Sequence, residues 1–223
     1  MKIIKGIKLN KIDFEIIKSV MTKWSNIYLN KVKPKVDDFD TCFFIENHKV
    51  IYLSLNGYTL NKFPNRIFEL VNLKELKLVS NEYTFIPESI DKLKNLELLN
   101  LRINELKALP RNLKNLKQLK YLDISHNHFK YLPEEICYLK NLEYLNIQST
   151  SIEELPSNID KLINLKELHI DDTHIKKLPK TLLSLKNLRK IVAYMWGEEE
   201  DEVYQILKKR NVKLSGFRLK KVS

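Results

Sequence analysis

The chain has 223 residues, of which 43 % are hydrophobic and 9 % aromatic, and its formal net charge is +11. It is a foldable composition with no apolar run long enough to cross a bilayer. The first residues carry a lysine every few positions and no apolar stretch followed by small residues, which argues against a secretory signal. We therefore expect a cytoplasmic protein, while noting that unconventional export leaves no trace in a sequence.

The distribution of charge and the positions of the two cysteines are the next features of the sequence. The positive charge is spread along the chain, with +4 in residues 1–49, +5 in residues 50–196 and +2 in residues 197–223. Cys42 and Cys137 are far apart in the sequence, and we expect two reduced, buried thiols rather than a disulfide.

Residues 1–49 precede a repeated pattern that begins at Val50, and we interpret them as an N-terminal cap. Residues 11–24 are predicted to form an amphipathic helix with Asn10 as its N-cap, and residues 41–45 have the composition of a strand. The apolar stripe of this helix consists of Phe14, Ile17, Val20, Met21 and Trp24. Because the segment is longer than a minimal cap, a separate interaction element is the alternative.

Residues 50–196 repeat one 23-residue pattern without insertion or deletion. Complete units begin at Val50, Leu73, Leu96, Leu119, Leu142 and Leu165, and an incomplete seventh unit begins at Leu188. A fixed period of this length indicates a solenoid, in which each unit buries its apolar face by stacking on its neighbours.

The first half of each unit is predicted to form a strand and a turn. Places 1, 4 and 6 are apolar, as at Leu96, Leu99 and Leu101, and the alternation of places 4 and 6 indicates a strand with one buried face. Place 9 favours asparagine, whose side chain satisfies backbone groups where the chain leaves the strand. Its occupants are Asn81, Asn104 and Asn127, with departures at Tyr58, Thr150 and Thr173.

The second half of each unit is predicted to return along the outer side of the solenoid. Place 15 is a proline in all six complete units and follows an apolar residue at place 14. The proline fixes φ and stops the strand. Apolar places 18 and 21, such as Ile136 and Leu139, indicate a short helical or 3₁₀ turn packed inward.

Residues 197–223 are interpreted as a C-terminal cap. A helix is predicted in which the acids of Glu198–Glu202 come first and the bases of Lys208–Arg210 come last, in agreement with the helix dipole. Residues 212–217 are expected to add an edge strand.

The units resemble the leucine-rich repeat family over residues 50–196, through the ending LPxxIxxLxNL followed by LxxLxLxxN. They look like its 23-residue intracellular class, which includes Ras-pathway scaffold, plant intracellular and leptospiral repeat proteins. The resemblance implies a right-handed α/β solenoid, or horseshoe, used for protein recognition. Parallel strands would line its concave face, 3₁₀ or short helical turns its convex face, and both ends would be capped.

Places 3, 5 and 7 of each strand are expected to point out of the concave face. Neighbouring strands lie about 4.8 Å apart, so Leu98, Tyr121 and Tyr144 at place 3 should form one apolar and aromatic patch. The hydrogen-bonding side chains expected around it are Asn100, Arg102, Asp123, Asn146, Gln148, His169 and Asp171.

Tyrosine anchors inside a polar ring are typical of protein-binding hot spots. The sequence thus predicts a non-catalytic module that binds a protein partner through its concave face, as an adaptor, a regulator or a bacterial host-interaction protein. The competing interpretation of the tyrosines is that aromatic residues are ordinary strand formers.

Metal and catalytic chemistry have weak candidates. His169 and Asp171 share a face and are the weak metal candidates, while His126 and His128 are too distant to join them directly. Asp123, Ser125 and His126 contain the groups of a hydrolase triad, but neighbours on one strand do not line up for proton transfer. We expect no cofactor and no enzymatic activity.

The alternative function is binding of nucleic acid or another anionic surface by the lysine-rich exterior. Salt dependence separates the two hypotheses, because phosphate neutralisation weakens steeply with added salt. The outer-turn lysines are Lys92, Lys94, Lys114, Lys117, Lys140, Lys161 and Lys186.

Overall fold

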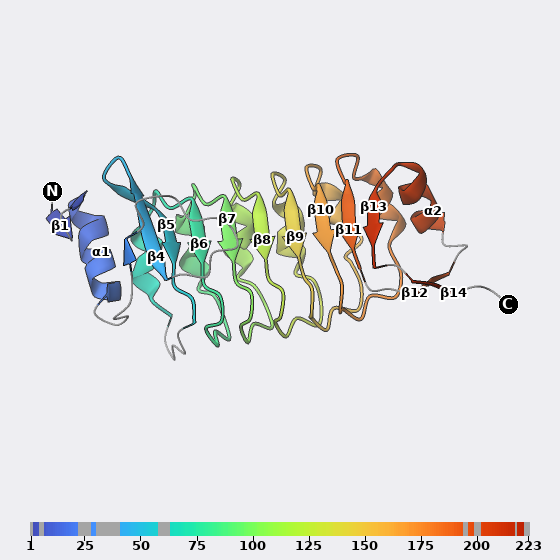
Figure 1. Ribbon diagram of the computed structural model, residues 1–223, viewed down its shortest axis with the longest axis horizontal. Coiled ribbons are helices and arrows are strands. Elements are labelled where there is room, and N and C mark those ends of the chain that lie inside the picture. The colour runs from blue at the N-terminus through green and yellow to red at the C-terminus, as the bar shows by residue number, and fades with distance from the viewer. Residues whose placement is uncertain are drawn as a thin grey trace.

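Figure 1 shows a computed structural model of the protein as an elongated solenoid, with strands along one face and short helical turns behind them. The predicted leucine-rich repeat fold class is confirmed. The structure describes residues 2–4, 7–21, 28–29, 41–57, 63–193, 196–198, 202–216 and 218–220.

A ten-stranded sheet runs the length of the molecule in the order β13-β11-β10-β9-β8-β7-β6-β5-β4-β3. From β5 to β11 every neighbour is parallel, and each residue pairs with the one 23 positions later, as Leu98 pairs with Tyr121 and Tyr121 with Tyr144. The register predicted from the period is therefore kept strand by strand. These strands are β5 (Lys49–Ser54), β6 (Glu75–Lys77), β7 (Leu98–Asn100), β8 (Tyr121–Asp123), β9 (Tyr144–Asn146), β10 (Glu167–His169) and β11 (Lys190–Val192).

Repeated leucines and isoleucines fill one continuous core between the sheet and the outer turns. Leu96, Leu99 and Leu101 are fully buried, and so are the equivalent residues of the other central units. The core cluster extends from Leu9 in the N-terminal segment to Val212 near the C-terminus, so the units share their apolar interior.

Each outer turn is a short 3₁₀ helix that starts after the proline of place 15. Pro87 has an extended backbone with φ −61°, and its carbonyl accepts a hydrogen bond from the Ile90 N–H at 3.1 Å. In the fifth unit the helix starts later, at Ile159, although Pro156 still accepts from the Ile159 N–H at 3.0 Å. The turns are η1 (Asn65–Glu69), η2 (Glu88–Lys92), η3 (Arg111–Asn115), η4 (Glu134–Tyr138), η5 (Ile159–Lys161) and η6 (Lys180–Ser184).

Asparagines at place 9 satisfy backbone groups where the chain leaves the strand, as predicted, and they also connect neighbouring units. The Asn104 Nδ2 donates to the carbonyls of Leu78 at 2.8 Å and Leu101 at 2.9 Å, and its Oδ1 accepts from the Tyr83 N–H at 3.1 Å. Thr150 makes part of this set, because its hydroxyl donates to the Ile147 carbonyl at 2.7 Å. Tyr58, the predicted departure in the first unit, lies outside the described residues.

The N-terminal end covers the first unit with a helix and a hairpin. Helix α1 (Lys11–Met21) is capped by Asn10, whose Oδ1 accepts from the Asp13 N–H at 2.9 Å, as predicted. Asp13 is itself buried, and its Oδ2 accepts from the Val50 N–H at 2.8 Å, which ties α1 to the first repeat. Trp24, at the end of the predicted helix, lies outside the described residues.

Four further strands belong to this end. β4 (Cys42–Glu46) confirms the strand predicted over residues 41–45 and pairs antiparallel with β5. β3 (Tyr28–Leu29) pairs with β4, and β1 (Lys2–Ile4) pairs with β2 (Ile7–Leu9).

The C-terminal end extends the solenoid by one more register step. β13 (Lys213–Ser215) confirms the predicted edge strand, and Lys213 pairs with Lys190 exactly one period earlier. Helix α2 (Glu202–Lys209) lies where an outer turn would be, next to η6, and a Glu202–Lys180 ion pair of 2.7 Å links the two.

The predicted C-terminal helix is confirmed only from Glu202 onward. Glu198 lies in strand β12 (Trp196–Glu198), which pairs with β14 (Arg218–Lys220), so its assignment to the helix was wrong. Glu199, Glu200, Asp201 and Phe217 lie outside the described residues.

Both cysteines are free and buried, and burial raises the pKa of the Cys137 thiol to about 12. Such a thiol stays protonated and unreactive at neutral pH. Over the described residues, the structure holds no helix with the length and apolar character needed to span a membrane.

Candidate concave-face binding site

The tyrosines predicted for the concave face stack on one another. The rings of Tyr121 on β8 and Tyr144 on β9 have centroids 4.2 Å apart and planes 3° apart. Leu98 on β7 is the strand partner of Tyr121 and is 6 % exposed. The three residues lie outside the core cluster, because they belong to the opposite side of the sheet from the repeated leucines.

His169 extends this stack by one strand. Its ring centroid lies 4.9 Å from that of Tyr144, with planes tilted by 48°. Sequence reasoning placed His169 in the polar surround, because it occupies place 5 rather than place 3. The structure brings it diagonally onto Tyr144, so Tyr121, Tyr144 and His169 form a continuous aromatic row, and Leu98 borders the row as the strand partner of Tyr121.

Burial sets the chemistry that the aromatic row presents. It raises the pKa of Tyr144 to about 12, with the Asp123 carboxylate acting in the same direction. The Tyr144 phenol is therefore neutral at physiological pH and keeps its O–H as a donor. Since Tyr121 and Tyr144 direct ring faces at each other, a ligand would contact ring edges and hydroxyls.

Three of the predicted polar side chains are hydrogen-bonded to the backbone. Asn100, Asp123 and Asn146 are buried at place 5 of β7, β8 and β9. Each side chain accepts a hydrogen bond from the backbone N–H two residues later, at 3.0 Å from Arg102, 2.9 Å from Ser125 and 3.0 Å from Gln148. They form the floor beside the aromatic row and hold the strand ends in place, rather than offering all their polar atoms to a partner.

Place 7 supplies the polar groups that remain for a ligand. The side chains of Arg102 and Gln148 are half-buried. Asp171 is 4 % exposed, and its Oδ1 has no hydrogen-bond partner among the described residues. Burial raises the pKa of the Asp171 carboxyl, because the charged form loses solvation.

The rim of the concave face has an unusual backbone. Gly57, Ser80, Ile103, His126, Ser149 and Asp172 all occupy place 8, and their φ angles lie between 52° and 74°. Only Gly57 gave a sign of this left-handed position in the sequence. Ile103 is the exception, because a β-branched side chain is disfavoured in this backbone conformation. The residue is also 42 % exposed.

The possible triad is not assembled. The Ser125 hydroxyl donates to the Asp123 Oδ1 at 2.6 Å, so it is bonded to the carboxylate that a triad would place behind a histidine. In the described part of the chain, His126 makes no hydrogen bond to Ser125. The arrangement serves the strand end and offers no activated nucleophile.

The metal candidates do not gather into a site. Across the described residues, the structure has no group of three or more His, Cys, Asp or Glu side chains that could hold an ion. The His169 Nε2 lies 3.4 Å from the Glu167 Oε2, and the His128 Nε2 lies 2.9 Å from the Glu105 Oε2. These histidines are engaged with glutamates.

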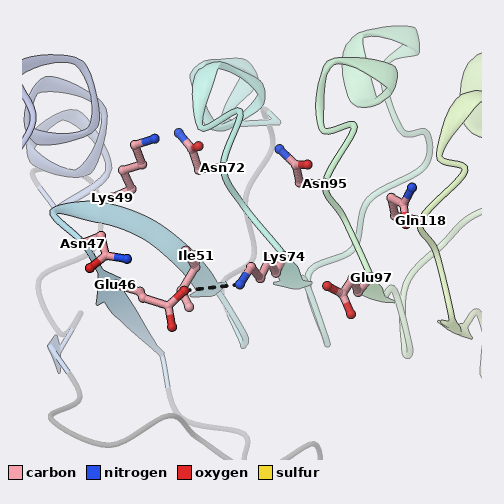
Figure 2. A pocket seen from close by; sticks show the side chains of 9 residues that line it. All are labelled: Glu46, Asn47, Lys49, Ile51, Asn72, Lys74, Asn95, Glu97 and Gln118. Carbon is pink, nitrogen blue, oxygen red and sulfur yellow. Dashed lines mark hydrogen bonds and ion pairs between the residues drawn. The ribbon is translucent and has the colours of Figure 1, made fainter.

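A second concavity lies at the edge where the strands begin. Figure 2 shows this recess of about 360 Å³, with Asn72, Asn95 and Gln118 on one side and Glu46, Lys74 and Glu97 on the other. Its charges are largely balanced within the protein.

Ion pairs between neighbouring units explain this balance. Lys74 pairs with Glu46 at 3.2 Å, and the pattern continues along the edge with Lys120–Glu97 at 2.7 Å and Lys166–Glu143 at 2.6 Å. The alternation of lysine and glutamate at place 2 was visible in the sequence but was not used. Because Lys74 and Glu97 of its lining are already engaged in ion pairs, this recess is a weaker candidate site than the concave face.

Comparison with known proteins agrees with the fold. A family model described as a leucine-rich repeat region matches residues 110–213. No curated protein matches the chain. Among solved structures, a leucine-rich repeat protein of Leptospira interrogans is 28 % identical with a TM-score of 0.65, over 82 % of this chain and 45 % of that one. The present chain thus spans less than half of the Leptospira protein.

Two further structures support the same architecture. Internalin C2 of Listeria monocytogenes is 25 % identical with a TM-score of 0.57, over 69 % of this chain and 68 % of that one. The leucine-rich repeat ectodomain of the Arabidopsis thaliana membrane receptor kinase GASSHO1/SCHENGEN3, solved in complex with CASPARIAN STRIP INTEGRITY FACTOR 2, is 22 % identical with a TM-score of 0.58. It covers 80 % of this chain and 24 % of that one and shows the fold alone.

The strand register, the hydrogen-bonded asparagines of place 9 (the asparagine ladder) and the 3₁₀ turns define an open leucine-rich repeat solenoid. Members of this class are typically non-catalytic protein-interaction modules. The family-model match over residues 110–213 supports a leucine-rich repeat protein.

Proposed function

We propose that the protein is a non-catalytic module that binds another protein through its concave face, with the aromatic row at the centre of the contact. The carrying observation is the stack of Tyr121 and Tyr144 outside the core, at a centroid distance of 4.2 Å. The leucine core is complete without these rings, so the fold gives no packing reason for them. Rigid aromatic side chains lose little entropy on binding and are enriched in hot spots.

The side chains bordering the row have complementary roles in this proposal. Arg102 offers a planar set of donors suited to a carboxylate, and Gln148 offers an amide. His169 continues the row, and the Asp171 carboxylate, whose Oδ1 is buried, adds a negative charge beside it. The buried Asn100, Asp123 and Asn146 act indirectly by fixing the strand ends that carry these groups.

Affinity purification from source cells tests the proposal with a matched pair of variants. We expect Tyr121→Ala/Tyr144→Ala to lose the captured partner. Phe85→Ala/Tyr131→Ala also removes two aromatic rings, which are exposed and lie outside the concave face, and should retain the partner. Circular dichroism would confirm that both variants are folded. Equal capture by both variants would exclude the aromatic row.

A further inference from the structure

The turns between the 3₁₀ helices and the strands present a regular row of side chains at place 22. In the central units this row contains Lys117, Lys140 and Ile163. An asparagine of the following unit holds the backbone of each. Asn141 donates to the Lys117 carbonyl at 2.8 Å, Asn164 to the Lys140 carbonyl at 3.0 Å, and Asn187 to the Ile163 carbonyl at 2.9 Å. The row is thus held at fixed spacing by the fold.

The lysines of this row differ in their ion pairs from the lysines at the edge where the strands begin. Lys74, Lys120 and Lys166 each face a glutamate within 3.2 Å. Within the described residues, Lys117, Lys140 and Lys161 form no ion pair. These three lysines are therefore left without an ion-pair partner, whereas the three at the edge where the strands begin are paired.

Two apolar side chains protrude among these cations. Tyr138 is 43 % exposed and Ile163 is 54 % exposed. The Lys117 Nζ lies 3.5 Å from the Tyr138 carbonyl, and the Lys161 Nζ lies 4.9 Å from the centroid of its ring. Cations from two different units thus converge on one aromatic residue of the unit between them.

We propose that this outer surface, formed by Lys117, Tyr138, Lys140, Lys161 and Ile163, docks the protein peripherally onto an anionic phospholipid membrane. Unpaired lysines are attracted to the negative headgroup layer, and exposed apolar side chains enter the interface between headgroups and acyl chains. The surface is separate from the concave face, which stays free for a protein partner.

The contacts of Tyr138 favour a lipid surface over a nucleic acid. Recognition of single strands relies on aromatic faces that are open for base stacking. One face of Tyr138 is covered by Lys161, and the exposed Ile163 offers no hydrogen-bonding group to a base or phosphate. Isoleucine and a tyrosine edge beside lysines suit a membrane interface.

Flotation with vesicles tests the inference on the full chain. Wild-type protein should bind vesicles of phosphatidylcholine and phosphatidylserine and not vesicles of phosphatidylcholine alone. Lys117→Gln/Lys140→Gln/Lys161→Gln should lower partition at least tenfold, since each basic residue near such a surface contributes about fivefold. The matched control Lys74→Gln/Lys120→Gln/Lys166→Gln removes the same charge and should lower partition by less than about threefold.

Ile163→Ser tests the apolar contribution without changing charge and should also weaken binding to the mixed vesicles. Equal losses in the two triple variants would show attraction by net charge alone and overturn the inference. So would wild-type protein that does not distinguish the vesicles, or DNA-duplex binding that depends on the same lysines while vesicle binding does not.

Discussion

Ile103 lies in a backbone conformation that its side chain disfavours. Its φ of 56° is positive, like that of every described residue at place 8, but the other occupants are glycine, serine, histidine and aspartate. Left-handed backbone costs an ordinary residue about 1–2 kcal/mol, and asparagine tolerates it better. We expect Ile103→Asn to raise the free energy of unfolding by about 1 kcal/mol in urea titrations.

Ile163→Asn is the matched control for this prediction. Ile163 is also an exposed isoleucine, but it is absent from the residues with positive φ. Its replacement should leave stability within about 0.5 kcal/mol of wild type. An equal gain in both variants would mean that removing exposed apolar surface, and not relief of strain, is responsible.

Asp171 is a residue where stability and binding should conflict. Its carboxyl pKa is raised in the folded protein by burial, above the ordinary value of 3.8. The folded state therefore favours the protonated form, and the stability this provides is present below pH 3.8 and is lost as pH rises through the folded pKa. Asp171→Asn should raise the melting temperature at pH 7, and the gain should disappear near pH 3.

The same variant should capture less of the concave-face partner, because it removes the negative charge of Asp171 beside the aromatic row. A variant that is more stable at pH 7 and binds equally well would leave Asp171 outside the contact. A melting temperature that does not rise would show that the buried charge is compensated.

Single residues also mark the limit of inference from sequence at this scale. The place-3 tyrosines were identified because the strand period fixes which side they occupy. The direction of each polar side chain was not predicted, since Asn100 and Asp123 turn back to backbone N–H groups instead of facing solvent. The alternation of a strand sets its faces, while local hydrogen bonds decide what a short polar side chain contacts.

The asparagine ladder is the element that joins neighbouring turns. The Asn104 Nδ2 donates to three carbonyls, those of Leu78, Leu101 and Arg102. Its Oδ1 accepts from the backbone N–H groups of Asn81 at 3.2 Å and Tyr83 at 3.1 Å. Asn104→Ala leaves these buried groups unsatisfied, and we expect a loss of about 3 kcal/mol in urea unfolding.

Two comparisons make this prediction specific. Asn104→Thr should lose about half as much, because Thr150 and Thr173 each donate one bond to the carbonyl three residues earlier. Asn95 makes one exposed bond to the Val71 carbonyl at 2.9 Å, so Asn95→Ala should cost about 1 kcal/mol. Similar losses in all three variants would contradict a special role for the buried ladder.

Elements that follow the consensus were predictable, and those that depart from it were not. Proline at place 15 followed by apolar places 18 and 21 correctly predicted a 3₁₀ turn in each complete unit. The seventh unit has no such proline, and its outer turn is the α-helix from Glu202 to Lys209. Backbone pairing of Lys190 with Lys213 keeps the period there although the leucine pattern has faded.

At the scale of the molecule, units interact mainly with their nearest neighbours. Each strand of the ten-stranded sheet pairs with its neighbours in the series from β3 to β13, and the outer turns pack in the same order. Stability is then approximately a sum over units and the interfaces between them. The period made this architecture predictable, whereas the partner is not, because it depends on variable residues that the fold leaves unconstrained.

Removal of a complete unit follows from this architecture and tests fold and function together. Deleting residues 73–95 should leave a folded but less stable solenoid, because β5 and β7 carry the same register and can pair directly. Deleting only residues 84–95 removes the outer turn, and the remaining chain is too short to cross between parallel strands, so this variant should not fold. Deleting residues 119–141 should again fold but lose the partner, since Leu98 would then face Tyr144 without Tyr121 between them. Circular dichroism and affinity purification separate the three outcomes, and partner capture by the last variant would show that stacked tyrosines are not required.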